Sequence, residues 1–73
     1  MDIILPAFSS RLKSLRKEHR LTQKAMADLL GKTERHYQDI EAGKINVSAT
    51  MLMALAQQFS VSTDYLLGLR DDR

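Results

Sequence analysis

The sequence contains no cysteine and no tryptophan, and it has one proline and three glycines among its 73 residues. Without cysteine, the chain can form neither a disulfide framework nor a thiolate metal site, which fits a reducing cytoplasm. Its apolar runs are only a few residues long, so we expect no membrane span, and residues 1–8 lack the features of a signal peptide. These absences predict a soluble, cytoplasmic protein.

The length and the hydrophobic content together predict a small folded unit. A chain of 73 residues is near the lower limit for a self-sufficient core, but its hydrophobic content of 44% favours compact folding over disorder. The sequence has no internal repeat, low-complexity segment or linker. We therefore expect a single domain over 1–73, in which an apolar arm (1–5) and a charged, frayed tail (69–73) flank a helical core (6–68).

Residues 22–43 contain two short helical patterns joined by a tight turn. Thr22 and Thr33 precede the two patterns, where a threonine hydroxyl can accept a hydrogen bond from a first-turn amide. Gly31 and Gly43 stand where the helices should end, because glycine readily adopts the left-handed conformation needed there. Two short helices in this arrangement are typical of a unit that holds one helix against nucleic acid.

The apolar positions predict which face of each of these helices is buried. The buried stripe of the first is expected to comprise Met26, Ala27, Leu29 and Leu30. Tyr37 and Ile40 should form the inner face of the second. The outer face of that helix is then left with Glu34, Arg35, His36, Gln38 and Asp39.

The remaining sequence predicts three more helices and no strands, so the expected fold class is all-α with five helices. Pro6 suits the first turn of the first helix, Ser48 should cap the fourth, and Ser62 should cap a short fifth helix over 63–67 that ends at Gly68. Apolar residues at helical spacing give the first and fourth helices their buried faces: Phe8, Leu12, Leu15, Leu52, Leu55, Ala56 and Phe59. The residues expected to fill gaps in the core are Met26, Met51 and Met53.

Positive charge is concentrated in the part of the chain that contains the two-helix unit. The formal net charge is only +2, but residues 11–44 hold nine basic and five acidic side chains. This asymmetry fits a surface that faces phosphates, and a solvated basic first helix is the alternative interpretation.

The sequence offers little for catalysis or metal binding. His19 and His36 are the only histidines, and they lack both thiolate partners and the spacing of a metal site. No glycine-rich phosphate loop or nucleophile elbow is present. We therefore expect no enzymatic activity, no metal and no cofactor.

Four segments carry a resemblance to a known family: RLKSLRKEHRLTQ (11–23), ADLLG (27–31), DIEAGK (39–44) and LAQQFSVSTDYLLG (55–68). With these segments, the chain resembles the Cro–repressor helix-turn-helix family of phage repressors and xenobiotic-response-element-type bacterial regulators. The resemblance extends from about residue 8 to residue 68. It implies a compact five-helix domain like that of lambda repressor, in which the third helix (about 34–42) enters the major groove of double-stranded DNA.

The resemblance also implies roles for individual residues. Gln23 matches a glutamine that bridges the DNA backbone and the first base pair, while Arg16 and Glu41 match a structural pair that joins the first helix to the end of the third. The positions implied to bind DNA are Gln23, Lys32, Thr33, Glu34, Arg35, His36, Asp39, Lys44 and Asn46.

The chemistry of these side chains suggests which of them would contact bases and which would contact phosphates. Arg35 is the best candidate base reader, because a guanidinium can donate two hydrogen bonds to guanine. Contacts to phosphates would come from Lys32, Lys44 and Asn46. Glu34 and Asp39 place two carboxylates on the same face, where they could accept from cytosine N4 or weaken DNA binding, and Asp39 could instead neutralise Arg35.

Two positions depart from the family pattern. Tyr37 replaces a smaller branched residue, and we expect its ring inside the domain with its hydroxyl at the rim. Val47 stands where the family often has proline, which predicts a looser loop before the fourth helix.

The expected function is sequence-specific binding of double-stranded DNA by a transcriptional regulator, a repressor. One reading helix covers few base pairs, so we expect a weak homodimer. It would form through Leu66, Leu67 and Leu69 or through the apolar arm Ile3–Leu5. The alternative function is a protein-interaction module on the same fold, such as an antitoxin or a regulatory partner with weak or no DNA binding.

Overall fold

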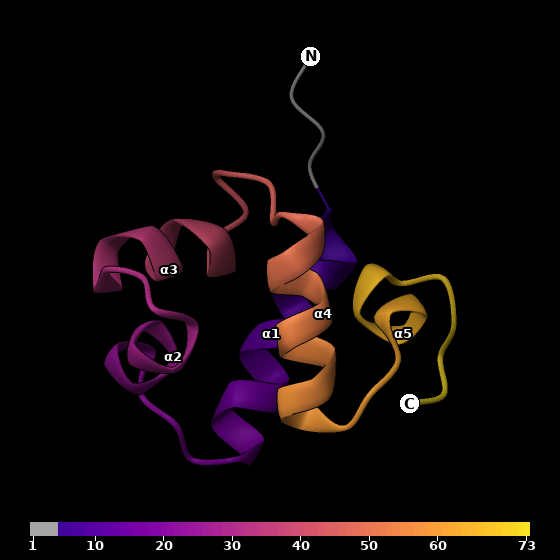
Figure 1. Ribbon diagram of the computed structural model, residues 1–73. Coiled ribbons are helices and arrows are strands. Elements are labelled where there is room, and N and C mark those ends of the chain that lie inside the picture. The colour runs from indigo at the N-terminus through magenta and orange to yellow at the C-terminus, as the bar shows by residue number, and fades with distance from the viewer. Residues whose placement is uncertain (1–4) are drawn as a thin grey trace.

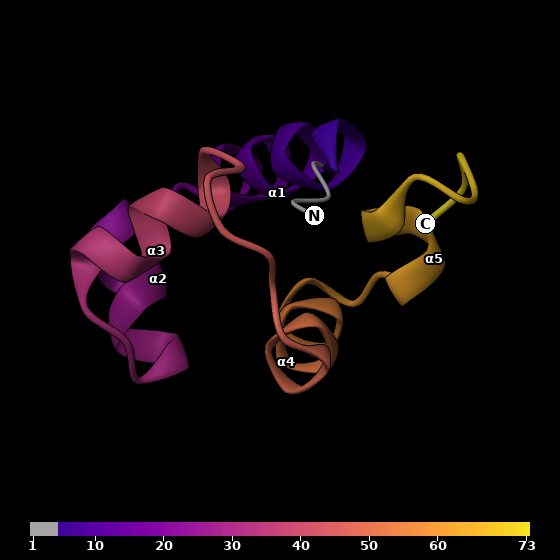
Figure 2. The ribbon, with the colours of Figure 1, turned by 90° about the horizontal axis from the view of Figure 1, so that it is seen from above.

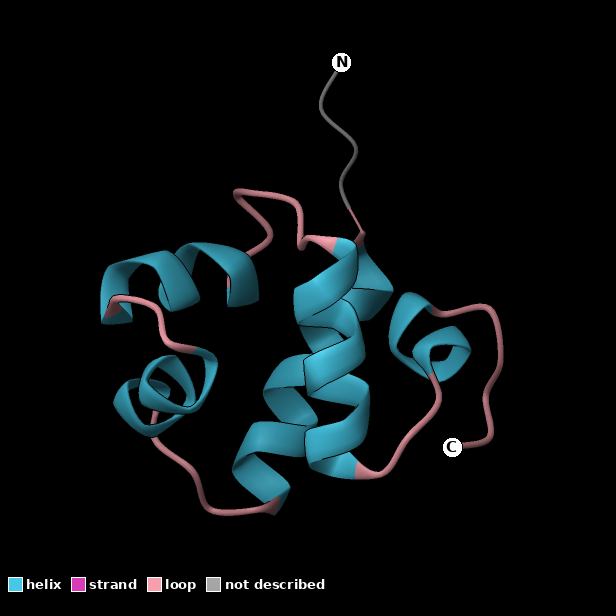
Figure 3. Cartoon of the chain, viewed as in Figure 1, coloured by secondary structure: helices cyan, strands magenta, loops and turns pink. Residues whose placement is uncertain are grey.

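The computed structural model describes residues 5–73, and that range contains five helices and no strand (Figures 1 and 3). The helices are α1 (Pro6–Glu18), α2 (Gln23–Leu30), α3 (Glu34–Glu41), α4 (Ala49–Phe59) and α5 (Thr63–Leu67). The all-α, five-helix prediction is confirmed. None of these helices is long and apolar enough to cross a membrane.

The helices surround one hydrophobic core. α1 and α4 occupy the middle of the molecule, with α2 and α3 on one side and α5 on the other (Figure 1). Seen from above, α1 and α4 are separated by the space that the core side chains fill (Figure 2). The core residues that are almost fully buried are Leu12, Leu15, Met26, Tyr37, Ile40, Leu55 and Leu66.

Side-chain caps start every helix after α1, as the sequence predicts. The capping hydroxyls accept hydrogen bonds from amides three residues later, and they belong to Thr22, Thr33, Ser48 and Ser62. α1 begins instead at Pro6, whose missing amide proton costs nothing in a first turn. At Gly68, which ends α5 with a φ of +84°, a Cβ atom would lie 2.6 Å from that of Ala7. Glycine therefore permits the close approach of α5 to α1.

Two residues expected in the core lie on the surface. Leu29 is 55% exposed and Met53 is 58% exposed, so the prediction that they are buried is wrong. Successive residues of a helix are rotated by about 100° around its axis. Leu29 and Met53 are each rotated by roughly 100° or more from the centre of the buried face of their helix. The stripes themselves are narrower than expected: α2 buries Met26 and Ala27, with Leu30 only half-buried.

The C-terminal segment 69–73 is exposed and forms no helix, but it makes side-chain contacts with α1. The Arg11 guanidinium lies 4.2 Å from the ring centroid of Tyr65 and donates hydrogen bonds to the backbone carbonyls of Tyr65 and Arg70. Arg73 forms a 3.0 Å ion pair with Glu18, the last residue of α1. These long-range contacts, formed by charged side chains of α1, have no signature in hydrophobic periodicity.

A buried carboxylate joins three of the helices. Glu41 is only 6% exposed, and its two oxygens accept hydrogen bonds from Arg16 Nε at 2.8 Å and Arg16 Nη2 at 3.0 Å. The hydroxyl of Tyr37 donates to the same carboxylate at 2.6 Å, and Gln23 Nε2 donates at 3.4 Å. Arg16 also donates to the backbone carbonyl of Leu21 at 2.8 Å. Because Tyr37 is fully buried, the expectation that its hydroxyl lies at the rim is wrong.

The surroundings of Glu41 favour its charged form. Burial on its own raises the pKa of Glu41, but hydrogen bonds from Arg16 and Tyr37 and the positive charge of Arg16 outweigh it, so the pKa is lower than usual. Burial also raises the pKa of Tyr37, and its hydrogen bond to Glu41 raises it further. The cluster therefore contains an ionised carboxylate, an ionised guanidinium and a neutral phenol at neutral pH.

We predict that Glu41→Gln lowers the free energy of unfolding by about 3 kcal/mol at pH 7, because the variant leaves the charge of Arg16 buried without its partner. Urea denaturation followed by circular dichroism would measure this. The matched control is Asp39→Asn on the same helix, which removes only the more exposed ion pair with Arg35 and should cost less than about 0.5 kcal/mol.

The difference between wild type and Glu41→Gln should also depend on pH. The pKa of Glu41 is lower in the folded chain than in the unfolded chain, so its contribution is complete above the ordinary pKa of 4.5 and is lost as pH falls through the lowered value. The two proteins should therefore converge in stability in acid. A constant difference from pH 7 to pH 2 would contradict the assigned charge state of Glu41.

Candidate nucleic-acid interface

α2 and α3 form a two-helix unit with a turn of three residues, 31–33. Gly31 adopts the left-handed conformation with a φ of +66°, and the backbone amide of Lys32 donates to the carbonyl of Ala27 at 2.9 Å. The hydroxyl of Thr33 then accepts from the amide of His36 at 3.1 Å, which starts α3. These local hydrogen bonds fix the direction of α3 relative to α2, and they leave the first turn of α3 exposed to solvent.

Arg35 is an exposed basic side chain on α3. Its side chain is 79% exposed, and its Nε lies 3.4 Å from Asp39 Oδ1 one turn later. An exposed pair of this kind contributes little to stability, so the guanidinium can exchange Asp39 for another acceptor. The structure thus brings Arg35 and Asp39 together, and it keeps the donors of Arg35 within reach of a ligand.

The other predicted residues at the start of α3 are also on the surface. Glu34 and His36 are exposed, and Glu34 accepts a hydrogen bond from Gln38 at 3.4 Å. Glu34 lies in the first turn of α3, where a negative charge interacts favourably with the helix dipole. The carboxylate therefore has a local structural role in addition to any contact with a ligand.

Basic and amide side chains flank both ends of α3. Lys32 precedes the helix, whereas Lys44 and Asn46 follow it, and all three residues are exposed. The amide of Lys44 donates to the carbonyl of Asp39 at 2.9 Å, so the backbone at the end of α3 is fixed. Within residues 5–73, neither lysine has an ion-pair partner, so both ammonium groups are available to an anionic ligand.

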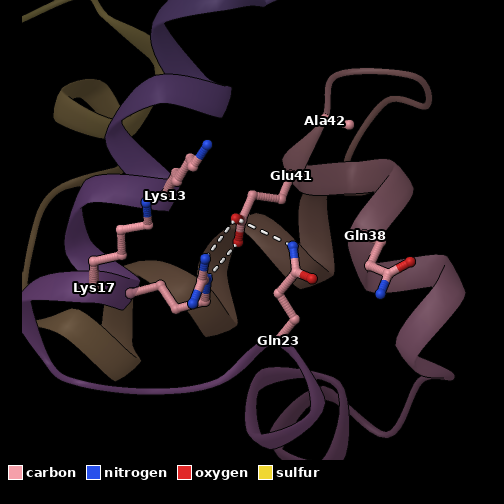
Figure 4. A pocket seen from close by; sticks show the side chains of 7 residues that line it. Lys13, Lys17, Gln23, Gln38, Glu41 and Ala42 are labelled. Carbon is pink, nitrogen blue, oxygen red and sulfur yellow. Dashed lines mark hydrogen bonds and ion pairs between the residues drawn. The ribbon is translucent and has the colours of Figure 1, made fainter.

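Gln23 lies beside the buried cluster. The side chain is half-buried at the start of α2, and its amide nitrogen points toward Glu41 (Figure 4). The structure therefore brings Gln23 together with Arg16 and Glu41. Arg35, Lys32 and Lys44 are exposed to solvent and do not belong to this cluster.

Sequence reasoning missed a polar hollow next to this cluster. Its volume is about 340 Å³, and its lining residues are Lys13, Arg16, Lys17, Gln23, Gln38, Glu41 and Ala42. The sequence indicated no role for Lys13 and Lys17 beyond their contribution to the positive charge of residues 11–44. Their spacing of four residues, which places both on one face of a helix, is the signal that could have identified them.

The leucines expected at a dimer interface have different environments. Leu66 is fully buried in the core of its own chain, so its assignment to an interface is wrong. Leu67 is half-buried and Leu69 is 72% exposed. Ile3 and Ile4, in the other predicted interface, lie outside the described residues.

His19 has a packing role, with its ring edge-on to that of Phe59 at a centroid distance of 5.0 Å. In the described part of the chain, no three His, Cys, Asp or Glu residues are grouped as metal ligands.

The sequence is similar to known regulators. A family described as helix-turn-helix matches residues 12–66. The uncharacterized HTH-type transcriptional regulator YobD of Bacillus subtilis (strain 168) is 38% identical over 65 residues, which cover 89% of this chain and 58% of that protein. A second regulator described in the same way, YqaE of the same organism, is 42% identical over 60 residues, or 82% and 52% of the two chains. The chain thus spans somewhat more than half the length of these relatives.

Solved structures share the fold. The restriction-modification controller protein C.AhdI from Aeromonas hydrophila superposes with a TM-score of 0.74 at 31% identity, over 85% of this chain and 94% of that chain. The hydroxypropylphosphonic acid epoxidase from S. wedmorenis has a TM-score of 0.77 at 25% identity, over 90% of this chain but only 35% of that one. This fold therefore also occurs as part of a larger enzyme, and function must be inferred from the site.

The match over residues 12–66, the two regulators of similar sequence and the five-helix structure lead to one conclusion: this chain belongs to the helix-turn-helix family of the Cro–repressor type.

Proposed function

We propose that this protein binds a short double-stranded DNA site in a sequence-specific manner and regulates transcription, acting as a repressor, with α3 in the major groove. The observation that carries the proposal is the exposed guanidinium of Arg35 on the second helix of the helix-turn-helix unit, with Lys32 and Lys44 at the two ends of that helix. The similarity to transcriptional regulators and to a controller protein supports it.

Affinity and specificity would come from different side chains. Lysine contacts to phosphates release counterions, which provides salt-dependent affinity for any sequence, and Lys32 and Lys44 would have this role. Asn46 is uncharged and would contribute a hydrogen bond to a phosphate. Arg35 would donate two hydrogen bonds to guanine, with Asp39 holding its side chain in position before binding. Glu34 would accept from cytosine N4 beside it.

Repression would follow from occupation of the DNA site, which requires neither catalysis nor a cofactor. With DNA as its proposed partner, the protein would act in the cytoplasm.

A weak homodimer would increase specificity, because two reading helices cover two half-sites one helical turn apart. Leu67 and Leu69 remain the candidate contacts at the end of α5. Leu69 is an exposed apolar side chain that a second copy of the chain could cover.

The first test is fluorescence-anisotropy binding to a pool of randomised duplexes at two salt concentrations, followed by sequencing of the bound fraction. We expect binding that weakens steeply with salt and enrichment of a palindromic sequence. No binding even at low salt would contradict the proposal and favour a protein-interaction module.

The two kinds of DNA contact can be separated with Arg35→Ala and Lys44→Ala. Arg35→Ala should cost about 1–3 kcal/mol of binding free energy on the enriched site and relax the preference at one base pair. Lys44→Ala should weaken binding to all sequences alike and reduce the slope of log affinity against log salt by about one. Identical behaviour of the variants on specific and random DNA would show that the assigned roles are wrong.

The dimer can be tested by analytical ultracentrifugation with and without the enriched operator. Wild type should associate at high micromolar concentration and more strongly on DNA, whereas Leu69→Gln should weaken association without destabilising the fold, since the side chain is already exposed. A monomer under all conditions would exclude the dimer.

A further inference from the structure

The hollow beside the buried cluster is bordered by three helices. Lys13 and Lys17 line it from α1, Gln23 enters from the start of α2, and Gln38 lies across from the lysines on α3 (Figure 4). Its floor contains the Arg16–Glu41 ion pair. A volume of about 340 Å³ is far larger than one water molecule requires, and every wall carries a polar side chain.

The hollow has an excess of positive charge. Arg16 and Glu41 compensate each other, and the Glu41 carboxylate already accepts hydrogen bonds from Arg16, Tyr37 and Gln23. Lys13 and Lys17 have no carboxylate partner among residues 5–73. Two uncompensated ammonium groups therefore remain at one edge of the hollow.

The spacing of the two lysines costs the helix some stability. Like charges four residues apart on one helix repel each other, and Lys13 and Lys17 have this spacing on α1. A bound anion would remove the repulsion, since each ammonium group can donate up to three hydrogen bonds. The arrangement thus favours a ligand with a compact negative charge.

The hollow lies next to the face of α3 that the proposed function assigns to DNA. Gln38 lines the hollow and also hydrogen-bonds to Glu34, at the start of the helix face that presents Arg35. The hollow therefore adjoins the face of α3 that would enter the major groove. A duplex placed there would have a sugar–phosphate backbone beside it, on the side of α1.

We propose that the hollow is a further DNA-contacting site, in which Lys13 and Lys17 bind one backbone phosphate opposite Gln38. The inference deepens the proposed function and rests on it. This contact would add a third point of attachment to those at the two ends of α3 and would limit the rotation of α3 within the groove.

The test compares Lys13→Gln/Lys17→Gln with wild type on the enriched DNA. A matched control, Arg70→Gln/Arg73→Gln, removes the same charge on the α5 side of the molecule, away from α2 and α3 (Figure 1). The lysine variant should bind roughly 10-fold more weakly at 0.1 M salt, and its log–log salt slope should fall by about one. The control should change affinity by less than about 2-fold, because screening limits the effect of distant charges.

Phosphate-ethylation interference would locate the contact. Ethylation of one phosphate per half-site should weaken wild type but have no effect on the lysine variant, while the control should keep the wild-type pattern. Circular dichroism would verify that all three proteins are folded, as expected because the substituted lysines and arginines are all exposed.

Three results would overturn the inference, and they have different meanings. An unchanged salt slope and ethylation pattern in the lysine variant, with wild type still binding DNA, would exclude the phosphate contact but keep the proposed function. Failure of wild type to bind any DNA would exclude both. Saturable NMR shifts of the Gln23 and Gln38 amides with inorganic phosphate, together with an unchanged DNA salt slope, would assign the hollow to a free anion.

Discussion

The carboxylate of Glu41 is the group on which the arrangement of α1, α2 and α3 depends. A buried charge is tolerated only when its hydrogen-bonding capacity is satisfied, and here the donors come from Arg16 on α1, Gln23 on α2 and Tyr37 on α3 itself. The hydrophobic effect that holds these helices together is non-directional. The geometry of the hydrogen bonds at Glu41 adds that directional constraint, so it helps to set the face that α3 presents to solvent.

Much of the fold could be predicted because its local signals are strong. Each of Thr22, Thr33, Ser48 and Ser62 stands before an amphipathic segment, and a hydroxyl at the start of a helix has few alternative uses. The exposure of Leu29 and Met53 could not be predicted in the same way. Helix periodicity gives a stripe but not its width, and the width depends on how the neighbouring helices pack.

The contacts that were missed involve residues far apart in the sequence. Arg11 and Glu18 look like ordinary surface charges of an amphipathic helix, yet they hold the C-terminal segment in place. The exposed face of α3 could be predicted because it depends on local periodicity. The hollow could not, because residues far apart in the sequence form it. It exists because α1, α2 and α3 converge around Glu41, and only the three-dimensional arrangement places Gln38 across from Lys13.

The division of α3 into two faces has a consequence for how the protein could change over time. Tyr37, Ile40 and Glu41 face inward and are constrained by the core and the buried cluster. Glu34, Arg35 and His36 point outward and make few contacts within the chain. A mutation in the outward set can therefore alter ligand preference without an accompanying loss of stability. The same eight-residue helix can thus serve descendants with different specificities while its scaffold stays fixed.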